Sequence, residues 1–311
     1  MDTEKIMPYQ GFDINSVTIP DLNEEELNTI SKYIEITRHV QEIHQLFAVF
    51  RYNLISVLST YELSNSDKLI RRKSYLGDFD DRTEVNALII SYISAGKTLT
   101  DSLEACMLGT ESVHDACREY KELLSKVYDE SFSYRLLVRL RDYSQHGHLP
   151  VSIDNNMFCF DIAQIIETPH FNHNKSLKNE MKSFAEELLV RCSTQPHYVF
   201  SLAVAEYTAA MAKIYYEFWI RIKDAFSSLN DDFSRLIANH PEYIIHQNKN
   251  FNGWFFYQLD NTLHCFNTKE ASSEMIKKYT DEAELFYDGQ EKELQLFRSS
   301  IRMVKMEKKV E

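Results

Sequence analysis

The amino-acid sequence predicts a mostly α-helical fold: an antiparallel helical bundle with a small β-hairpin excursion and a C-terminal helical appendix. Apolar residues make up 44% of the 311-residue chain, which is enough to bury a sizeable core. The chain has only 7 glycines and 6 prolines, so few positions favour turns or interrupt a helix. Over long stretches the apolar residues recur about every three to four positions, which is the spacing of one helix face.

The first helix is predicted to follow an irregular lead-in over residues 1–23. Pro20 and Asp21 form a helix-start signal, and the three glutamates that come soon after them suit a first helical turn. From Leu27 to Tyr61 the apolar residues then follow a continuous helical stripe. The same reasoning predicts further helices over about 85–109, 111–128, 131–146, 177–191, 198–229, 231–238 and 270–305, with a loop over 64–81 after the first helix.

Two segments depart from helical spacing. Residues 151–168 are interpreted as an excursion with a small hairpin that turns at 154–156. Residues 254–266 are rich in aromatic side chains and carry Asp260-Asn261 at their centre, which predicts a second β-hairpin. The best domain boundary lies between residues 229 and 252, which would separate a bundle over 24–229 from a C-terminal appendix over 230–311.

Charge and cysteine content narrow the classes of function. The net charge is −13, so the surface repels nucleic acid on average and broad non-specific binding is not expected. No run of about 18 apolar residues could span a bilayer, and the N-terminus has no signal-peptide pattern, so no membrane association is predicted. The five scattered cysteines indicate reduced thiols, and a cytoplasmic location is expected.

One segment has a composition that suggests chemistry. Arg141 and His146 are separated by four residues at the predicted end of a helix, and Asp142 lies four residues before His146. Asp142 could therefore orient the imidazole while the helix lasts. Arg141 and His146 are about 140° apart around a regular helix. They would converge only if the helix ends near Gln145 or if a second chain completes the site.

A guanidinium and an imidazole can together cleave RNA without a metal ion. Arginine carries a permanent charge in a planar fork that matches a phosphate group. Histidine titrates near neutral pH, so it can accept the proton of a ribose 2′-OH that attacks the adjacent phosphorus. The guanidinium stabilises the charge that builds on the phosphoryl oxygens. A proton must also reach the leaving 5′ oxygen, and two copies of the motif at a dimer interface would supply it.

A helical bundle with this motif, and with a polar residue directly after the arginine, resembles the HEPN family of helical ribonucleases. The resemblance covers the motif and, loosely, residues 24–229; it leaves 230–311 unexplained. It implies that Arg141 and His146 are the catalytic pair and that Asp142 is the polar helper. It also implies a homodimer that cleaves RNA without metal or cofactor. The family's roles in toxin–antitoxin and antiviral defence systems further imply a possible antitoxin or other protein partner.

Several basic side chains near the motif are candidates for contacting the RNA backbone. They are Lys68, Arg71, Arg72 and Lys73 from a loop, Arg135 and Arg139 from one helix face, and His148. Solvated charges that balance an acidic surface are the commoner case for such residues. The alternative for the motif itself is structural, with Arg141 and Asp142 in surface ion pairs and His146 near a helix C-terminus. The chain would then be a non-catalytic helical interaction protein, or a module that binds RNA or nucleotide without cleaving it.

Two other patterns predict neither a cofactor nor a metal. The sequence Gly96-Lys97-Thr98 resembles part of a phosphate-binding loop, but Ser91 stands where the full motif requires glycine, and the segment lies within a predicted helix. The histidines at 170 and 173 have no carboxylate or cysteine at a recognisable zinc spacing.

Overall fold

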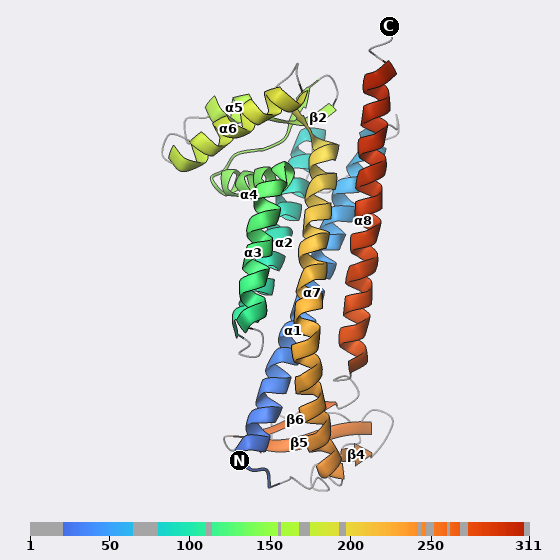
Figure 1. Cartoon of the computed structure of the whole chain (residues 1–311). Helices are drawn as coiled ribbons and strands as arrows, with labels where there is room; N and C mark the ends of the chain where they lie inside the picture. Colours follow the sequence, from blue (N-terminus) through green and yellow to red (C-terminus); the bar gives the residue numbers. More distant parts are fainter. Residues whose placement is uncertain are drawn as a thin grey trace. The chain divides into compact units, whose positions relative to one another are not determined.

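The structure is a computed structural model that describes residues 21–64, 80–109, 114–154, 157–167, 175–192, 197–241, 244–246, 252–259, 262–267 and 273–307. The chain forms two compact units. Unit 1 comprises Met1–Gln41 and Ile222–Thr280, and unit 2 comprises Glu42–Arg221 and Asp281–Glu311. The long helices α1 (Glu24–Ser64), α7 (Phe200–Asn239) and α8 (Ser273–Glu307) each contribute to both units (Figure 1). The sequence predicted instead a bundle over 24–229 and an appendix over 230–311, with a boundary between residues 229 and 252; α7 runs past residue 229 to Asn239.

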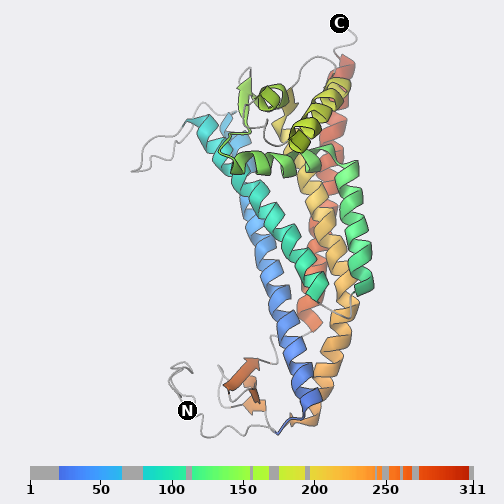
Figure 2. The same ribbon diagram turned by 90° about the vertical axis from the view of Figure 1, so that its left-hand side faces the viewer.

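The mostly helical fold class is confirmed. Besides its parts of the long helices, unit 2 contains α2 (Asp81–Gly109), α3 (His114–Glu130), α4 (Phe132–Gln145), α5 (Ile162–Glu167) and α6 (Lys175–Cys192). Helix α4 packs against α2, α3 and α6, and it runs crosswise to α3 in both views (Figures 1 and 2). The helices predicted over 85–109, 111–128 and 177–191 are confirmed, with small shifts at their ends.

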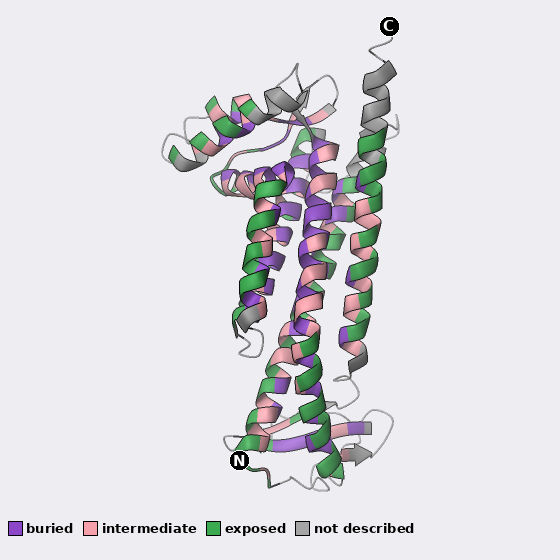
Figure 3. Cartoon of the chain, viewed as in Figure 1, coloured by how far each residue is buried: buried purple, intermediate pink, exposed green. Residues whose placement is uncertain are grey.

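The core of unit 2 is built from large aromatic side chains. Tyr215 stacks on Phe47 with ring centroids 3.8 Å apart, which ties α7 to α1. The Tyr92 hydroxyl lies 2.7 Å from Thr208 Oγ1, so its polar atom has a partner inside the core. Figure 3 shows extensive burial along α7 in this unit, whereas α3 and α8 also carry many exposed residues.

The hairpin predicted within 151–168 is confirmed, but the segment contains more than a hairpin. Strands β1 (Ser152–Asp154) and β2 (Met157–Asp161) pair in antiparallel fashion, and β2 also pairs with β3 (His197–Val199). Helix α5 follows β2 directly. Sequence spacing placed residue 198 in a helix, which was wrong, because a three-residue strand is specified by its distant partner on β2 and not by a local pattern.

Unit 1 contains one end of α1 and of α7 together with a second sheet. The sheet has the order β4 (Ile244–His246), β5 (Asn252–Leu259) and β6 (Thr262–Asn267), and all its pairs are antiparallel. The register pairs Leu259 with Thr262, which confirms the hairpin predicted around positions 260 and 261. Tyr33 of α1 stacks on Phe233 of α7 at 3.9 Å between ring centroids.

Helix α1 begins as the sequence predicts. The Asn23 side chain accepts a hydrogen bond from the Glu26 backbone N–H, and the Glu26 carboxylate accepts one from the Asn23 N–H, each at 3.0 Å. This reciprocal pair satisfies backbone donors that the first helical turn leaves free. Residues 21–23 precede the helix in irregular conformation. Residues 1–20 of the predicted lead-in, and the basic run of Lys68, Arg71, Arg72 and Lys73, lie outside the described residues.

Helix α7 corrects a second prediction. The sequence indicated a helix ending near residue 229 and a short one over 231–238, but α7 is continuous to Asn239. The polar residues in this stretch do not mark a break: Asn230 is buried and its Oδ1 accepts a hydrogen bond from the Tyr33 hydroxyl at 3.5 Å. Among the described residues, no helix is both long and apolar enough to cross a membrane.

Candidate functional site

The motif lies at the C-terminal end of α4, whose boundaries follow from local chemistry. Ser131 is the N-cap, and its hydroxyl oxygen accepts a hydrogen bond from the Tyr134 backbone N–H at 3.2 Å. His146 is the C-cap with φ of −89°, and Gly147 follows with φ of +85°. Glycine adopts this left-handed conformation without strain, which is why the helix ends here. The buried side of α4 includes Phe132, Leu136, Leu137, Leu140 and Tyr143.

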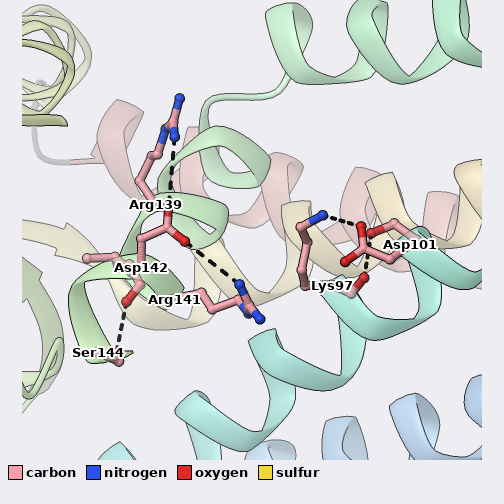
Figure 4. Close-up of polar contacts among 8 residues, drawn as sticks. Lys97, Asp101, Arg139, Arg141, Asp142 and Ser144 are labelled. Carbon is pink, nitrogen blue, oxygen red and sulfur yellow. Dashed lines mark hydrogen bonds and ion pairs between the residues drawn. The ribbon is translucent and has the colours of Figure 1, made fainter. Parts of the chain in front are cut away.

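Two arginines converge on one carboxylate in this helix. Arg139 Nη1 lies 3.6 Å from Asp142 Oδ2, and Arg141 Nη1 lies 3.8 Å from Asp142 Oδ1 (Figure 4). The Arg141 side chain is 25% exposed, so part of it is accessible to solvent, whereas its Nε atom is buried. Asp142 therefore contacts the two cations and makes no bond to His146, although the spacing allowed the latter. The helix has ended at His146, so the side chains at positions 142 and 146 no longer share a helical face.

Arg139 has a second partner on another helix. Its Nε lies 2.8 Å from Glu180 Oε2 of α6, and the Tyr128 hydroxyl of α3 donates a hydrogen bond to the other oxygen of the same carboxylate. Glu180 was not singled out from the sequence, because nothing local in α6 distinguishes it from other glutamates. These contacts join three helices behind the motif and hold Arg139 in place. They also leave Arg139 less available to a phosphate than a solvated arginine would be.

The third residue of the motif is His146, which caps the C-terminal end of α4. The residue is exposed, and among the residues that the structure describes its imidazole makes no hydrogen bond or ion pair. Only its backbone N–H is engaged, with Tyr143 O at 3.2 Å. No contact within one chain joins His146 to Arg141. Within one chain, the Arg141 guanidinium and the His146 imidazole therefore lie at the same end of α4 but do not contact each other.

The two other candidate residues on this part of the chain contact aromatic rings. His148 stacks on Tyr143, with ring centroids 4.7 Å apart. Arg135 lies over the Phe184 ring at 5.6 Å, and its Nη1 donates to the Asp129 carbonyl oxygen at 3.4 Å. Both side chains are only half-buried, so they retain some accessible surface beside the motif.

Sequence reasoning did not select Tyr207, a buried tyrosine of α7 near Arg141. Burial raises the pKa of Tyr207 well above its ordinary value, and the Arg141 cation opposes that rise, so the guanidinium lies near the phenol. A Cβ added to Gly96 of α2 would come within 2.3 Å of the Tyr207 hydroxyl oxygen. The glycine of the partial phosphate-loop pattern therefore serves close packing of α2 on α7, and Lys97 pairs with Asp101 one helical turn later.

The described part of the chain contains no group of three or more histidine, cysteine or carboxylate side chains that could hold one metal ion. No family model matches the chain, and comparisons with curated proteins and with solved structures find no significant match.

Proposed function

We propose that this chain is a HEPN-like, metal-independent endoribonuclease that acts as a homodimer. The observation that carries the proposal is the state of His146. Its imidazole is exposed and has no partner among the described residues, at the same helix end as an Arg141 that Asp142 holds. An imidazole engaged in a structural hydrogen bond would be a poor proton acceptor, whereas this one is free to reach a substrate.

Each group has a defined part in the reaction. The imidazole takes the proton of the ribose 2′-OH, the new bond joins that oxygen to phosphorus, and the bond from phosphorus to the 5′ oxygen breaks. A protonated imidazole of the second copy supplies the proton to the leaving oxygen. The products are a 2′,3′-cyclic phosphate and a free 5′-OH. The Arg141 guanidinium stabilises the phosphoryl oxygens, and Asp142 orients that guanidinium.

The same geometry supports the proposed homodimer. Because no contact in one chain joins Arg141 to His146, one phosphodiester would be bound most readily between the α4 ends of two copies. Arg135 and His148 flank the motif and would contact neighbouring phosphates. Lys68, Arg71, Arg72 and Lys73, for which the sequence predicts a loop, would do the same. A toxin or antiviral defence role, with an antitoxin as partner, belongs to the same proposal.

The test is RNA cleavage in the presence of EDTA. Purified chain is expected to cut RNA and to leave 2′,3′-cyclic phosphate ends, and Arg141→Ala and His146→Ala are each expected to lower the rate by roughly 100-fold or more. Arg118→Ala provides the control, because Arg118 is exposed on α3 away from the motif. Intact RNA with the folded wild-type chain, or equal activity in Arg118→Ala and Arg141→Ala, would reject the proposal.

A second candidate function is supported by a different surface. Helix α1 carries large apolar side chains that are exposed: Val49, Tyr52, Ile55 and Leu58 are between 42% and 72% accessible. Such a face is typical of a protein–protein contact and favours a non-catalytic interaction protein. Tyr52→Glu tests it: loss of association between chains, or with a cellular partner, without any effect on RNA would favour this second function.

A further inference from the structure

Over residues 45–59 of α1, one face of the helix is largely exposed and carries no charged side chain. This α1 face consists of Gln45, Ala48, Val49, Tyr52, Ile55, Ser56 and Ser59. Val49, Tyr52 and Ile55 are 49%, 72% and 63% exposed. The one charged residue of the stretch, Arg51, lies over the ring of Phe47 at 5.7 Å and over that of Phe286 on α8 at 5.8 Å. Solvated helix faces are normally charged, so an uncharged face of this length in a chain of net charge −13 indicates a surface that a partner covers.

The serine hydroxyls of the α1 face are already bonded within the helix. The Ser56 hydroxyl donates a hydrogen bond to the Tyr52 carbonyl oxygen at 3.0 Å, and the Ser59 hydroxyl donates to the Ser56 carbonyl oxygen at 2.7 Å. Beside the face, the Asn53 side-chain amide donates to the Val49 carbonyl oxygen at 2.9 Å. A donor that loses its partner makes burial costly. Because these donors keep their partners inside the helix, an apolar surface can cover the face at little cost.

We propose that the α1 face binds the same face of a second copy, with the two α1 helices antiparallel and Tyr52 at the two-fold axis. A contact with two-fold symmetry requires that, where residue i meets residue j, residue j also meets residue i. The α1 face meets this condition because its residues are placed symmetrically about Tyr52. Val49 and Ile55, both large and apolar, lie three residues to either side of it, and the small residues Ala48 and Ser56 lie four residues to either side. Large side chains thus meet large ones, and the small pair lets the two helices approach closely.

Charge favours a second copy over other partners. Each copy carries −13, so two copies repel each other over most of their surface, whereas joining two α1 faces brings no carboxylates together. A helix that binds a lipid surface carries several lysines or arginines, but Arg51 is the only one between residues 42 and 59. The contact is about 22 Å long and buries about half of the roughly 800 Å² per partner of a stable complex, so we expect a dissociation constant of roughly 10–100 μM. It includes none of Arg141, Asp142 and His146, so it does not rest on the proposed ribonuclease.

Sedimentation equilibrium of the full chain, from about 1 μM to about 300 μM, measures the association. Tyr52→Glu places two carboxylates against each other at the axis and should weaken the dimer by at least about tenfold. Leu108→Glu is the matched control, because it adds the same charge at a leucine that is 59% exposed on α2, outside the α1 face. The control should leave the dissociation constant unchanged. Since Tyr52 is exposed, the circular dichroism of Tyr52→Glu should match that of the wild type.

Disulfide trapping tests the antiparallel register and carries the test alone if Tyr52→Glu does not fold. The chains also carry Cys265→Ser, because Cys265 is an exposed thiol. Tyr52→Cys should cross-link to itself in the dimer. Gln45→Cys should not, since its two copies would lie about 21 Å apart, beyond the reach of a disulfide. A mixture of Gln45→Cys and Ser59→Cys chains should cross-link, because the antiparallel register brings these two positions together.

Four results would overturn the proposal: a monomer up to about 300 μM, a dimer that Tyr52→Glu leaves intact, equal weakening by Tyr52→Glu and Leu108→Glu, or self-linking of Gln45→Cys. Binding of the wild-type chain to vesicles of phosphatidylcholine and phosphatidylserine, abolished by Tyr52→Glu, would overturn it as well and assign the face to a lipid surface. None of these measurements depends on RNA cleavage, so a failure of this proposal is distinguishable from a failure of the ribonuclease proposal.

Discussion

Arg141 forms an ion pair with the residue that directly follows it, Asp142, with 3.8 Å between Nη1 and Oδ1. Neighbours in a helix point about 100° apart, so such a pair forms only when both side chains bend toward each other. Arg139 approaches the same carboxylate from the preceding turn at 3.6 Å. Asp142 thus orients a partly exposed arginine side chain at the end of α4.

This arrangement predicts a modest effect for Asp142→Asn. The amide keeps the shape of the side chain but loses the charge that holds both guanidinium groups. RNA cleavage should fall by about threefold to tenfold, while the free energy of unfolding changes by less than about 1 kcal/mol because the pair is partly exposed. Initial rates on a defined RNA, together with urea unfolding, measure the two effects. A loss of activity as large as that of Arg141→Ala would instead make Asp142 a reacting group.

A site that uses the imidazoles of both chains predicts that an inactive chain silences its partner. When equal amounts of wild-type and His146→Ala chains are mixed and allowed to exchange, about half of the random dimers are mixed and hold only one of the two imidazoles. About a quarter of the dimers are then wild-type homodimers, so the rate should fall during exchange from roughly half to roughly a quarter of that of the same total amount of wild-type chain. The rate is measured before and after exchange. If each chain cleaves RNA on its own, exchange would leave the rate unchanged.

The parts of the fold that local signals specify could be predicted from the sequence. Helix α4 begins at a serine that caps it and ends at Gly147, whose positive φ suits glycine. The start of α1 and the hairpin around positions 260 and 261 were predicted on similar grounds. Strands β3 and β4 were missed, because a segment of three residues is too short to show an alternating pattern of apolar residues. Strand β3 also depends on a partner, β2, that is distant in the chain.

The candidate site was predicted in composition but not in contacts. The sequence placed Arg141, Asp142 and His146 at one helix end, and the structure agrees. The structural alternative placed Arg141 and Asp142 in ion pairs, and the two do pair with each other. The sequence did not show that Arg139 would approach the same carboxylate, nor that Glu180 of α6 would lie 2.8 Å from Arg139. These contacts depend on how α4 packs against other helices, and a single sequence does not reveal that packing. The continuation of α7 past residue 229 was missed for the same reason. The buried Asn230 accepts a hydrogen bond from Tyr33 of α1, a contact that the sequence does not reveal.

Close packing at Gly96 predicts a stability defect for Gly96→Ala. The new Cβ would lie 2.3 Å from the Tyr207 hydroxyl oxygen, so α2 and α7 must move apart, at a cost of about 1–3 kcal/mol in the free energy of unfolding. Gly289→Ala is the matched control: it lies within α8, nothing lies within 4 Å of its Cβ, and alanine should stabilise the helix by about 0.5–1 kcal/mol. Urea unfolding measures both, and destabilisation by Gly289→Ala would contradict the packing at that position.

The partner of Gly96 can be tested in a double-mutant cycle. Tyr207→Phe removes the oxygen that Cβ would strike, although the ring carbon that carried it stays 3.1 Å away. The double variant should therefore recover about 0.5–2 kcal/mol of the loss caused by Gly96→Ala alone. Purely additive effects would show that the two residues do not contact each other.

The ion pair between Glu26 and His240 predicts a pH dependence of stability. The hydrogen bond from His240 lowers the pKa of Glu26, and the Asn23 backbone N–H adds to this effect. His240 Nε2 lies 3.1 Å from Glu26 Oε1. A carboxyl whose pKa is lower in the folded state contributes stability above its unfolded pKa of about 4.3 and loses it as the pH falls through the folded value. The thermal midpoint should accordingly drop between about pH 5 and about pH 3.

The variant Glu26→Gln isolates this contribution. Its thermal midpoint should lie below that of the wild type at neutral pH, and the difference should shrink as the pH falls and the wild-type carboxyl is protonated. Glu35→Gln is the control, because Glu35 is an exposed carboxyl on the same helix with no ion pair among the described residues. Scanning calorimetry across this pH range gives the comparison. If the thermal midpoint of Glu26→Gln lies below that of the wild type by the same amount at every pH, the variant has lost packing or capping at the start of α1. The charge of Glu26 would then contribute nothing to stability.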